Sequence, residues 1–351
     1  MILWRMQLMR VIQELDLAEW NQFLEKHPLA NIYQTPEMFQ VLAHTAGHYP
    51  KLWAVVDDDG SVLALMLPVQ ITLVAGLLRG FTTRAVCYGS ILCAPGPEGN
   101  AALDLLLDTY QRKVGRHELF TELRNQYDLS AYQTLLNAKG FVFEDHLNFE
   151  IDLEQPEEVL WSKISRSARQ GIRAAEKRNV YVQEMTNAAG VFAAYPKLRQ
   201  VYTRVGVPLA DISLFEAACE ILAPRDMLKI FLAYAGTECI GAMIALTFKG
   251  RMIDWYAAGD RDTSALYWPN DTLVWYALRW GKQHGYRVFD FGGGGKPNEP
   301  YGPREFKRKF GGRQVNYGRN VSIHAHWRLT VSQAGYGLYR KLPRTRVRNV
   351  V

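Results

Sequence analysis

Residues 289–295 of this 351-residue chain are Phe289-Asp290-Phe291-Gly292-Gly293-Gly294-Gly295. The apolar residues that lead into four consecutive glycines predict a buried strand that ends in a loop. Because glycine has no side chain, the backbone N–H groups of this loop can turn outward and approach an anion or a carbonyl group. A flexible loop with no chemical role is the alternative reading.

A short cationic helix is predicted directly after this loop. Residues 302–312 are Gly302-Pro303-Arg304-Glu305-Phe306-Lys307-Arg308-Lys309-Phe310-Gly311-Gly312. Phe306 and Phe310 lie four residues apart, so they share one helix face and can pack inward while Lys307 points elsewhere. A glycine loop beside a cationic helix suits a polyanionic or acyl-carrying ligand. A solvated run of charges is the alternative.

The positive charge of the chain is concentrated at its C-terminal end. The net charge is +6, and residues 301–351 contain twelve Lys or Arg and one acidic residue, which gives +11 there and leaves −5 for residues 1–300. Such a distribution attracts nucleic acid, nucleotide-linked substrates or an anionic membrane face.

Two halves of the chain repeat one order of predicted elements: strand, helix, helix, three strands, helix, strand, helix, strand. In each half, apolar strands joined by a polar turn predict a hairpin, at residues 51–60 and again at residues 229–244. The repeat indicates an internal duplication. It predicts an α/β chain with mixed sheets, divided into a first domain (residues 1–153), a second domain (154–326) and a basic C-terminal tail (327–351).

A long helix over residues 157–179 is predicted to join the two domains. Four cations follow one another at spacings of three, four and four, so they form one stripe: Arg166, Arg169, Arg173 and Lys177. Like charges at these spacings repel one another, so the stripe suits a ligand that carries phosphates. A solvated face relieved by nearby glutamates is the alternative.

Composition places the protein among ordinary globular proteins. Hydrophobic residues make up 48% and charged residues 22% of the chain, and its N-terminus lacks the uninterrupted apolar segment of a signal peptide. Its four cysteines show no C-x-x-C spacing, which argues against a metal site or a disulfide framework. A cytoplasmic location is therefore expected, and the basic tail could dock on the inner membrane face.

The duplicated order resembles two tandem GNAT acyltransferase folds. The Fem family of aminoacyltransferases is similar in three motifs, Ser165-x-Ser167-x-Arg169-x-x-Ile172-Arg173-x-Ala175-x-Lys177, Tyr286-x-x-Phe289-Asp290-Phe291-Gly292-Gly293 and Phe306-Lys307-x-x-Phe310-Gly311. That family builds the interpeptide bridges of peptidoglycan from amino acids carried by aminoacyl-tRNA. No long heptad stretch is present, so the coiled-coil arm of some members is not expected.

The resemblance implies an enzyme that carries out N-acyl transfer without a covalent intermediate, a metal or a bound cofactor, with aminoacyl-tRNA as co-substrate and an amine of a cell-wall precursor as acceptor. It places Lys307 near the tRNA acceptor phosphates or the developing oxyanion, and Phe306 beside the terminal nucleotide. A backbone N–H within residues 255–258 would polarise the acyl carbonyl. Asp254 and Tyr256 are candidates for proton transfer, although packing of the strand in the core is the alternative for Tyr256.

The expected site therefore has two groups of residues. The catalytic candidates are Asp254, Tyr256 and Lys307, and the substrate- or phosphate-binding candidates are Arg166, Arg169, Arg173, Lys177, Gly292, Gly293, Gly294, Arg304 and Phe306.

Two other functions stay open. One is an acyl-CoA-dependent N-acyltransferase that acts on an amino sugar or amino-acid derivative of a surface polysaccharide. The pyrophosphate-binding glycine turn of such enzymes is missing from residues 259–264 and only partly matched at residues 96–101. The other is a non-catalytic protein that binds nucleic acid or an anionic surface through its basic tail.

Overall fold

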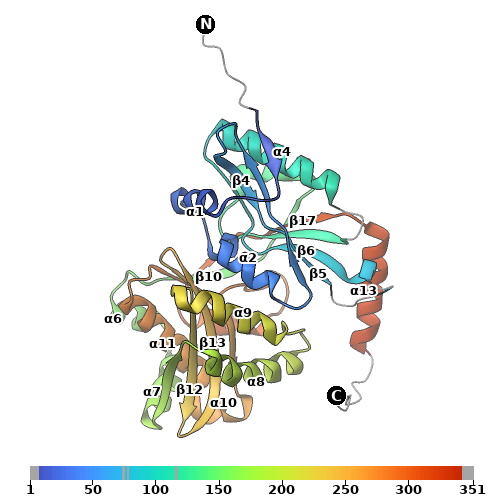
Figure 1. Cartoon of the computed structure of the whole chain (residues 1–351). Coiled ribbons are helices and arrows are strands. Elements are labelled where there is room, and N and C mark those ends of the chain that lie inside the picture. Colours follow the sequence, from blue (N-terminus) through green and yellow to red (C-terminus); the bar gives the residue numbers. More distant parts are fainter. Residues whose placement is uncertain (1–7, 73–75, 77–78, 115–117, 342–351) are drawn as a thin grey trace.

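The computed structural model describes residues 8–72, 76, 79–114 and 118–341 and shows two α/β domains packed against each other (Figure 1). The elements of the first half are β1 (Arg10–Ile12), α1 (Leu17–Lys26), α2 (Pro36–Ala43), β2 (His48–Pro50), β3 (Trp53–Val56), β4 (Val62–Met66), β5 (Val69–Thr72), α3 (Arg79–Thr82), β6 (Thr83–Cys87), β7 (Ile91–Cys93), α4 (Pro97–Lys113), β8 (Phe120–Arg124), α5 (Gln133–Ala138), β9 (Val142–Glu144) and β10 (Asn148–Asp152). Those of the second half are α6 (Glu157–Lys163), α7 (Arg166–Lys177), β11 (Val180–Met185), α8 (Ala188–Val205), α9 (Ile212–Leu222), β12 (Leu228–Ala235), β13 (Glu238–Phe248), β14 (Arg251–Gly259), α10 (Arg261–Tyr267), α11 (Pro269–Gln283), β15 (Val288–Asp290), α12 (Gly302–Arg308), β16 (Arg313–Val315), β17 (Arg319–Ile323) and α13 (His326–Lys341).

The second domain is built on one seven-stranded mixed sheet with the order β11-β12-β13-β14-β15-β10-β16. Helices α8 and α9 pack on one face of this sheet, and α11 packs on the other face with α7 beside it. Buried side chains alternate between the two faces of the sheet along β12 and β13. On β12, for example, Ile230 packs into the core under α8 and α9, whereas Phe231 packs into the core under α11. The sheet is therefore buried on both sides, as in other α/β proteins.

The first domain follows the same order of elements, but its sheet is divided in two. One part has the order β1-β3-β4-β7 and the other β2-β5-β6-β8-β17-β9. Pro68 lies between β4 and β5 and cannot donate a ladder hydrogen bond. Across from it, the chain turns between β6 and β7 at Ser90, whose φ is +63°. The sheet is thus divided between β4 and β5 and between β6 and β7, where Pro68 and the turn at Ser90 interrupt the hydrogen-bond ladder.

The two domains exchange strands. β10 comes from the end of the first half, yet it pairs with β15 and β16 in the second sheet. β17 comes from the end of the second half, yet it pairs with β8 and β9 in the first sheet. The predicted boundaries after residues 153 and 326 follow the chain order but do not describe the two sheets, because a chain-order prediction cannot detect pairing between distant strands.

Two predicted segments differ in the structure. The helix expected over residues 157–179 is broken into α6 and α7, because Ile164 is extended and the side chain of Ser165 caps α7 by accepting the N–H of Ala168. The predicted tail begins as α13, in which Trp327 meets Phe81 edge to face at 5.8 Å. Residues 342–351 of the tail lie outside the described residues.

The interface between the domains is an apolar core. Helix α2 of the first domain packs on α9 of the second (Figure 1), and Met38 and Val41 share one buried cluster with Leu214 and Ala218. Nζ of Lys249 adds polar contacts across the interface, since it donates to the carbonyls of Leu24, Glu25 and His27 at the end of α1. Continuous burial of this kind holds the domains in one arrangement.

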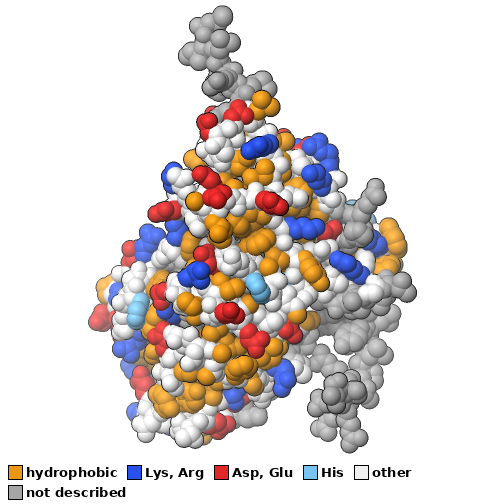
Figure 2. Space-filling view, in the orientation of Figure 1, with side chains coloured by type: hydrophobic (Ala, Val, Ile, Leu, Met, Phe, Trp, Pro, Cys, Tyr) orange, Lys and Arg blue, Asp and Glu red, His pale blue; other side chains and the backbone are white. Residues whose placement is uncertain are grey.

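Charges of both signs are interspersed over the face of the molecule shown in Figure 2, which is not a single basic surface. Among the described residues, none of the helices combines the length and apolar character needed to cross a bilayer.

Candidate active site

The edge between β14 and β15 opens part-way along the sheet of the second domain. The two strands pair in parallel only as far as Ile253 and Asp290, whereas β14 continues along β13 to Gly259. Its register with β13 shifts between Ile244 and Ala245, so Trp255 is an extra residue that forms a β-bulge. From Asp254 onward, one edge of β14 therefore has no strand partner. The bulge also changes the direction in which the side chains of β14 point.

A cavity of about 560 Å³ lies at this opening, between the two domains. Asp254, Tyr256 and Gly293 line it from the second domain. Tyr88 and Arg124 line it from the first domain. It is large enough to enclose a small acyl group and an amine together.

Two carboxylates line this cavity, Glu299 and Asp254, and Asp254 is the one on β14. Its side chain is half-buried, and burial raises its pKa from 3.8 to about 6, against the opposing effect of the Lys307 charge. Asp290 raises it further. A carboxylate with this pKa is largely ionised at neutral pH and can still accept a proton with little loss of driving force. The structure thus gives the predicted residue the property that a general base needs.

Tyr256 lies two residues along the same strand and also lines the cavity. Burial raises the pKa of its phenol well above the ordinary value, and neighbouring tyrosines act in the same direction. Its ring meets Phe215 edge to face at 4.8 Å, so the predicted core contact exists as well. A phenol that keeps its proton can donate a hydrogen bond but is unsuited to act as a base.

Lys307 holds the glycine loop in place. Its Nζ donates to the carbonyl oxygens of Phe291 at 2.6 Å, Gly292 at 3.0 Å and Gly293 at 2.9 Å. An ammonium group has three protons to donate, so these contacts use all of them. Burial lowers the pKa of Lys307, and the nearby charge of Asp254 opposes that effect. The expected contact with a phosphate or an oxyanion would require Lys307 to release this loop.

Two N–H groups of the glycine loop point inward, contrary to expectation. The N–H of Gly292, where φ is +63°, donates to Oδ1 of Asp290 at 2.8 Å, and the N–H of Gly294 donates to the carbonyl of Leu147. Gly293 is needed for close packing, since a Cβ at this position would lie 2.6 Å from Nε2 of His146. The first and third glycines therefore serve strand packing and loop shape, and their N–H groups are not free for an anion.

Arg304 and Phe306 also lie away from the cavity. Arg304 is buried and donates to the carbonyls of Gly294, Lys296 and Pro297, so it fixes the loop instead of binding a phosphate. Phe306 packs edge to face on Phe310 at 5.3 Å, which confirms the predicted inward pair.

The four cations of α7 form a separate surface, because none of them lines the cavity. Arg169 is half-buried and the other three are exposed. Within the described part of the chain none of the four has an ion-pair partner, although Arg173 lies over the ring of Trp161 at 5.4 Å. Glu157, one of the nearby glutamates of the alternative interpretation, pairs instead with Arg279 at 3.0 Å.

Known proteins share this architecture. Residues 162–308 match the family model described as an Acetyltransferase (GNAT) domain. The structure of FemX aligns with a TM-score of 0.67 over 95% of this chain and 100% of its own, at 15% identity. The chain has a FemX-like tandem GNAT fold. The predicted fold class is thereby confirmed.

Two further solved structures share the tandem GNAT fold. L-PGS from Bacillus licheniformis aligns with a TM-score of 0.57 at 14% identity, over 92% of this chain and 97% of its own. A tandem GNAT protein from the clavulanic acid biosynthesis pathway aligns with a TM-score of 0.55 at 10% identity, over 90% of this chain and 99% of its own. No curated protein sequence gives a match.

The tandem GNAT fold brings residues into the cavity that the sequence motifs do not identify. The wall from the first domain carries Tyr33 and Tyr88, whose rings stack at 5.9 Å, and Arg124, whose guanidinium lies 5.0 Å from the centre of the Tyr88 ring. Arg319 reaches the same wall on the exchanged strand β17. A local motif could not reveal them, because 195 residues separate the two arginines in the sequence.

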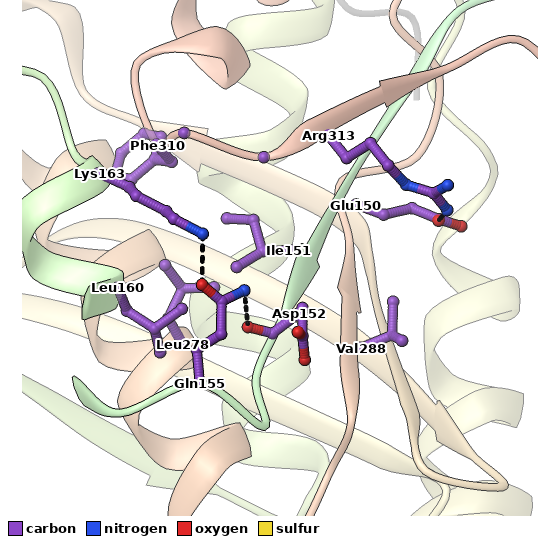
Figure 3. Close-up of a pocket in the computed structure, with 12 residues that line it drawn as sticks. Glu150, Ile151, Asp152, Gln155, Leu160, Lys163, Leu278, Val288, Phe310 and Arg313 are labelled. Atoms are coloured by element: carbon purple, nitrogen blue, oxygen red, sulfur yellow. Dashed lines mark hydrogen bonds and ion pairs between the residues drawn. The ribbon is translucent and has the colours of Figure 1, made fainter. Parts of the chain in front are cut away.

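A second cavity of about 470 Å³ lies elsewhere in the GNAT domain, between α6, β10 and β15 (Figure 3). Its polar side chains already bind one another: Lys163 donates to Gln155, which donates to the carbonyl of Asp152 at 3.2 Å, and Arg313 pairs with Glu150 at 3.0 Å. It contains none of the catalytic candidates. In the described ranges, no group of three or more His, Cys, Asp or Glu side chains could hold a metal ion.

Proposed function

We propose that this protein is an N-acyltransferase that moves an amino acid from aminoacyl-tRNA to an amine of a cell-wall precursor. The observation that carries the proposal is the half-buried carboxylate of Asp254, with a pKa of about 6, at the point where β14 leaves β15 and a cavity opens. The GNAT domain match over residues 162–308 supports acyl transfer.

The proposed reaction follows from the groups in the cavity. The acceptor ammonium loses a proton to Asp254, and the amine nitrogen then attacks the ester carbonyl carbon of the aminoacyl group. Backbone N–H groups on the open edge of β14 and the phenol of Tyr256 stabilise the oxyanion. The new C–N bond forms as the ester C–O bond breaks, the leaving tRNA oxygen takes the second proton that the nitrogen loses, and Asp254 releases the first proton to solvent. Lys307 contributes by holding the glycine loop beside Asp254.

The choice of aminoacyl-tRNA as donor is supported by charge. The α7 surface presents four cations without ion pairs among the described residues, and Arg and Lys at helical spacing suit the phosphates of an RNA backbone. The glycine turn that would cradle the pyrophosphate of CoA is missing after β14, where the chain passes directly into α10 (Arg261–Tyr267).

The acceptor proposed is a peptidoglycan precursor, and the role is in cell-wall assembly and cell shape. This part of the proposal rests on the likeness to FemX. It implies a cytoplasmic enzyme that can work at the inner membrane face, where lipid-linked precursors are found.

A donor assay tests the proposal. Purified protein would be incubated with radiolabelled aminoacyl-tRNAs and a bacterial extract of muropeptides and amino sugars, with labelled acetyl-CoA in a parallel reaction. Label that moves from tRNA to an amine supports the proposal. Transfer only from acetyl-CoA would assign the protein to the CoA-dependent N-acyltransferases, and no transfer from either donor would favour a binding protein.

Neutralising the α7 surface is expected to weaken tRNA binding. Replacement of Arg166, Arg169, Arg173 and Lys177 by Gln removes up to four phosphate contacts, so the affinity should fall about tenfold or more at 0.1 M salt, and its dependence on salt should become shallower. Binding of labelled tRNA at several salt concentrations measures both effects. As a matched control, Arg112→Gln removes an exposed arginine that pairs with Asp108 on α4 and should leave binding unchanged. An unchanged salt slope in the α7 variant would place the RNA elsewhere.

A further inference from the structure

Three arginines converge on one carboxylate beside the cavity. Oε1 of Glu122 accepts from Arg124 at 2.8 Å and from Arg319 at 2.6 Å. Burial opposes ionisation of Glu122, yet Arg124, Arg319 and Arg84 together hold the pKa of this carboxyl below its usual value. The cluster of Arg84, Glu122, Arg124 and Arg319, here called the arginine cluster, thus carries an excess of positive charge.

The register of the first sheet forces these charges together. Arg319 on β17 lies directly opposite Arg124 on β8, and like charges in that position are destabilising. Burial and the charge of Arg124 lower the pKa of Arg319 more than Glu122 raises it. Burial opposes the charge of Arg124, but Glu122 and Tyr88 outweigh burial and raise its pKa, so the repulsion is left uncompensated at Arg319.

The other groups around the arginine cluster do not neutralise it. Nε2 of His146 lies 3.0 Å from Arg319, and burial together with that charge lowers the pKa of His146 to about 4, so the ring is neutral at pH 7. Glu144 also faces Arg319, but its carboxylate pairs with Lys296 at 3.0 Å. Nε of Arg84 is buried and has no hydrogen-bond partner, so the cluster has an unused donor as well as an excess of positive charge.

The arginine cluster faces the proposed reaction centre. Arg124 and Arg319 line the same cavity as Asp254, and the charge of Arg124 reaches the phenol of Tyr256. One wall of the cavity therefore carries the proton acceptor, and the opposite wall carries two guanidinium groups. A guanidinium fork binds carboxylate and phosphate groups through paired hydrogen bonds.

We propose that the acceptor molecule carries an oxyanionic group, a carboxylate or a phosphate, which Arg124 and Arg319 bind while its amine lies beside Asp254. The role assigned to the bound group rests on the proposed acyl transfer, whereas the oxyanion site itself does not. The cluster would then orient the acceptor and exclude amines that lack the charge.

Binding of simple ions tests the site without any assumption about activity. Calorimetric titration of the protein with inorganic phosphate and with acetate, at constant ionic strength in chloride, should show saturable binding. In Arg124→Gln and Arg319→Gln the binding should weaken about tenfold or more. Arg313→Gln is the matched control, because this arginine pairs with Glu150 outside the cavity, and it should bind as the wild type does.

Kinetics with three small amines test the role of the bound group. With aminoacyl-tRNA as donor, β-alanine or O-phosphoethanolamine should exceed propylamine in kcat/KM about tenfold or more, mainly through KM, and the better of the two identifies the oxyanion as carboxylate or phosphate. Arg124→Gln should abolish this preference. Arg124→Lys keeps the charge and a bond to Glu122, so it should retain part of the preference. This conservative variant distinguishes loss of the oxyanion site from misfolding of Arg124→Gln.

The outcomes separate the two proposals. Acyl transfer with equal use of all three amines would overturn the inference and leave the proposed function standing. Ion binding that disappears in Arg124→Gln, in a protein that transfers no acyl group, would support the oxyanion site and count against the function. Absence of saturable ion binding in the wild type would overturn the oxyanion site.

Discussion

Replacing Asp254 with Asn is expected to lower kcat/KM for acyl transfer by about 10²–10⁴-fold at pH 8, the usual contribution of a positioned general base. The amide has nearly the shape of the carboxylate but cannot accept the proton of the acceptor ammonium. In the wild type, kcat/KM should rise with pH around a midpoint near 6, the pKa of this group. Initial rates from pH 5 to 9 measure both effects.

The same substitution should stabilise the protein. Burial holds the pKa of Asp254 near 6 instead of 3.8, so the folded state binds this proton more tightly than the unfolded state. Stability is therefore lost as the pH rises from about 4 to about 6, and above pH 6 the full loss is up to about 3 kcal/mol. Asp254→Asn removes that term and should raise the melting temperature at pH 8 but not at pH 4. Asp271→Asn is the control, because Asp271 lies outside the cavity and burial raises its pKa as well. If Asp254→Asn keeps full activity, another group takes the proton.

Replacing Lys307 with Met is expected to destabilise the fold by about 2–4 kcal/mol and to abolish activity. The change removes one ammonium and leaves the carbonyls of Phe291, Gly292 and Gly293 without their donor. The loss is costly for Phe291, which is buried, and for Gly292, which is half-buried. Urea unfolding with and without the substitution measures the loss of stability.

A nearby lysine provides the comparison. Lys309 lies two residues further on, 5.8 Å from the ring centre of Phe306, and Lys309→Met should change the free energy of unfolding by less than about 1 kcal/mol. If Lys307 instead served mainly as a phosphate contact, Lys307→Met would leave stability unchanged and make tRNA binding less dependent on salt. That result would contradict the role assigned to Lys307 here.

Local sequence signals predicted the fold well. The two hairpins and the repeated order of elements are governed by apolar alternation and turn residues within short segments. The inward pair of Phe306 and Phe310 follows from helix geometry alone. Asp254 became a candidate through the resemblance to GNAT folds, which points to the fourth strand of the second repeat, and its catalytic role stays a prediction.

The geometry of the candidate site could not be predicted in the same way. A run of glycines permits outward N–H groups, but the closeness of Leu147 and His146 determines that the loop turns inward. The sequence predicts that Arg304 and Lys307 bind a ligand, since their bonding to loop carbonyls depends on three-dimensional contact. Arg124 and Arg319 meet only through long-range strand pairing.

The strand exchange also sets an order of events during synthesis. The sheet that ends in β9 cannot receive β17 until residues 319–323 have left the ribosome, which at 5–20 residues per second is roughly 10–30 s after β9 itself. Until then, β8 and β9 expose unpaired edges to other nascent chains. The first domain is thus completed last, and a chain that ends before residue 319 would lack β17, leave β9 without its partner strand and remove Arg319 from the cavity wall.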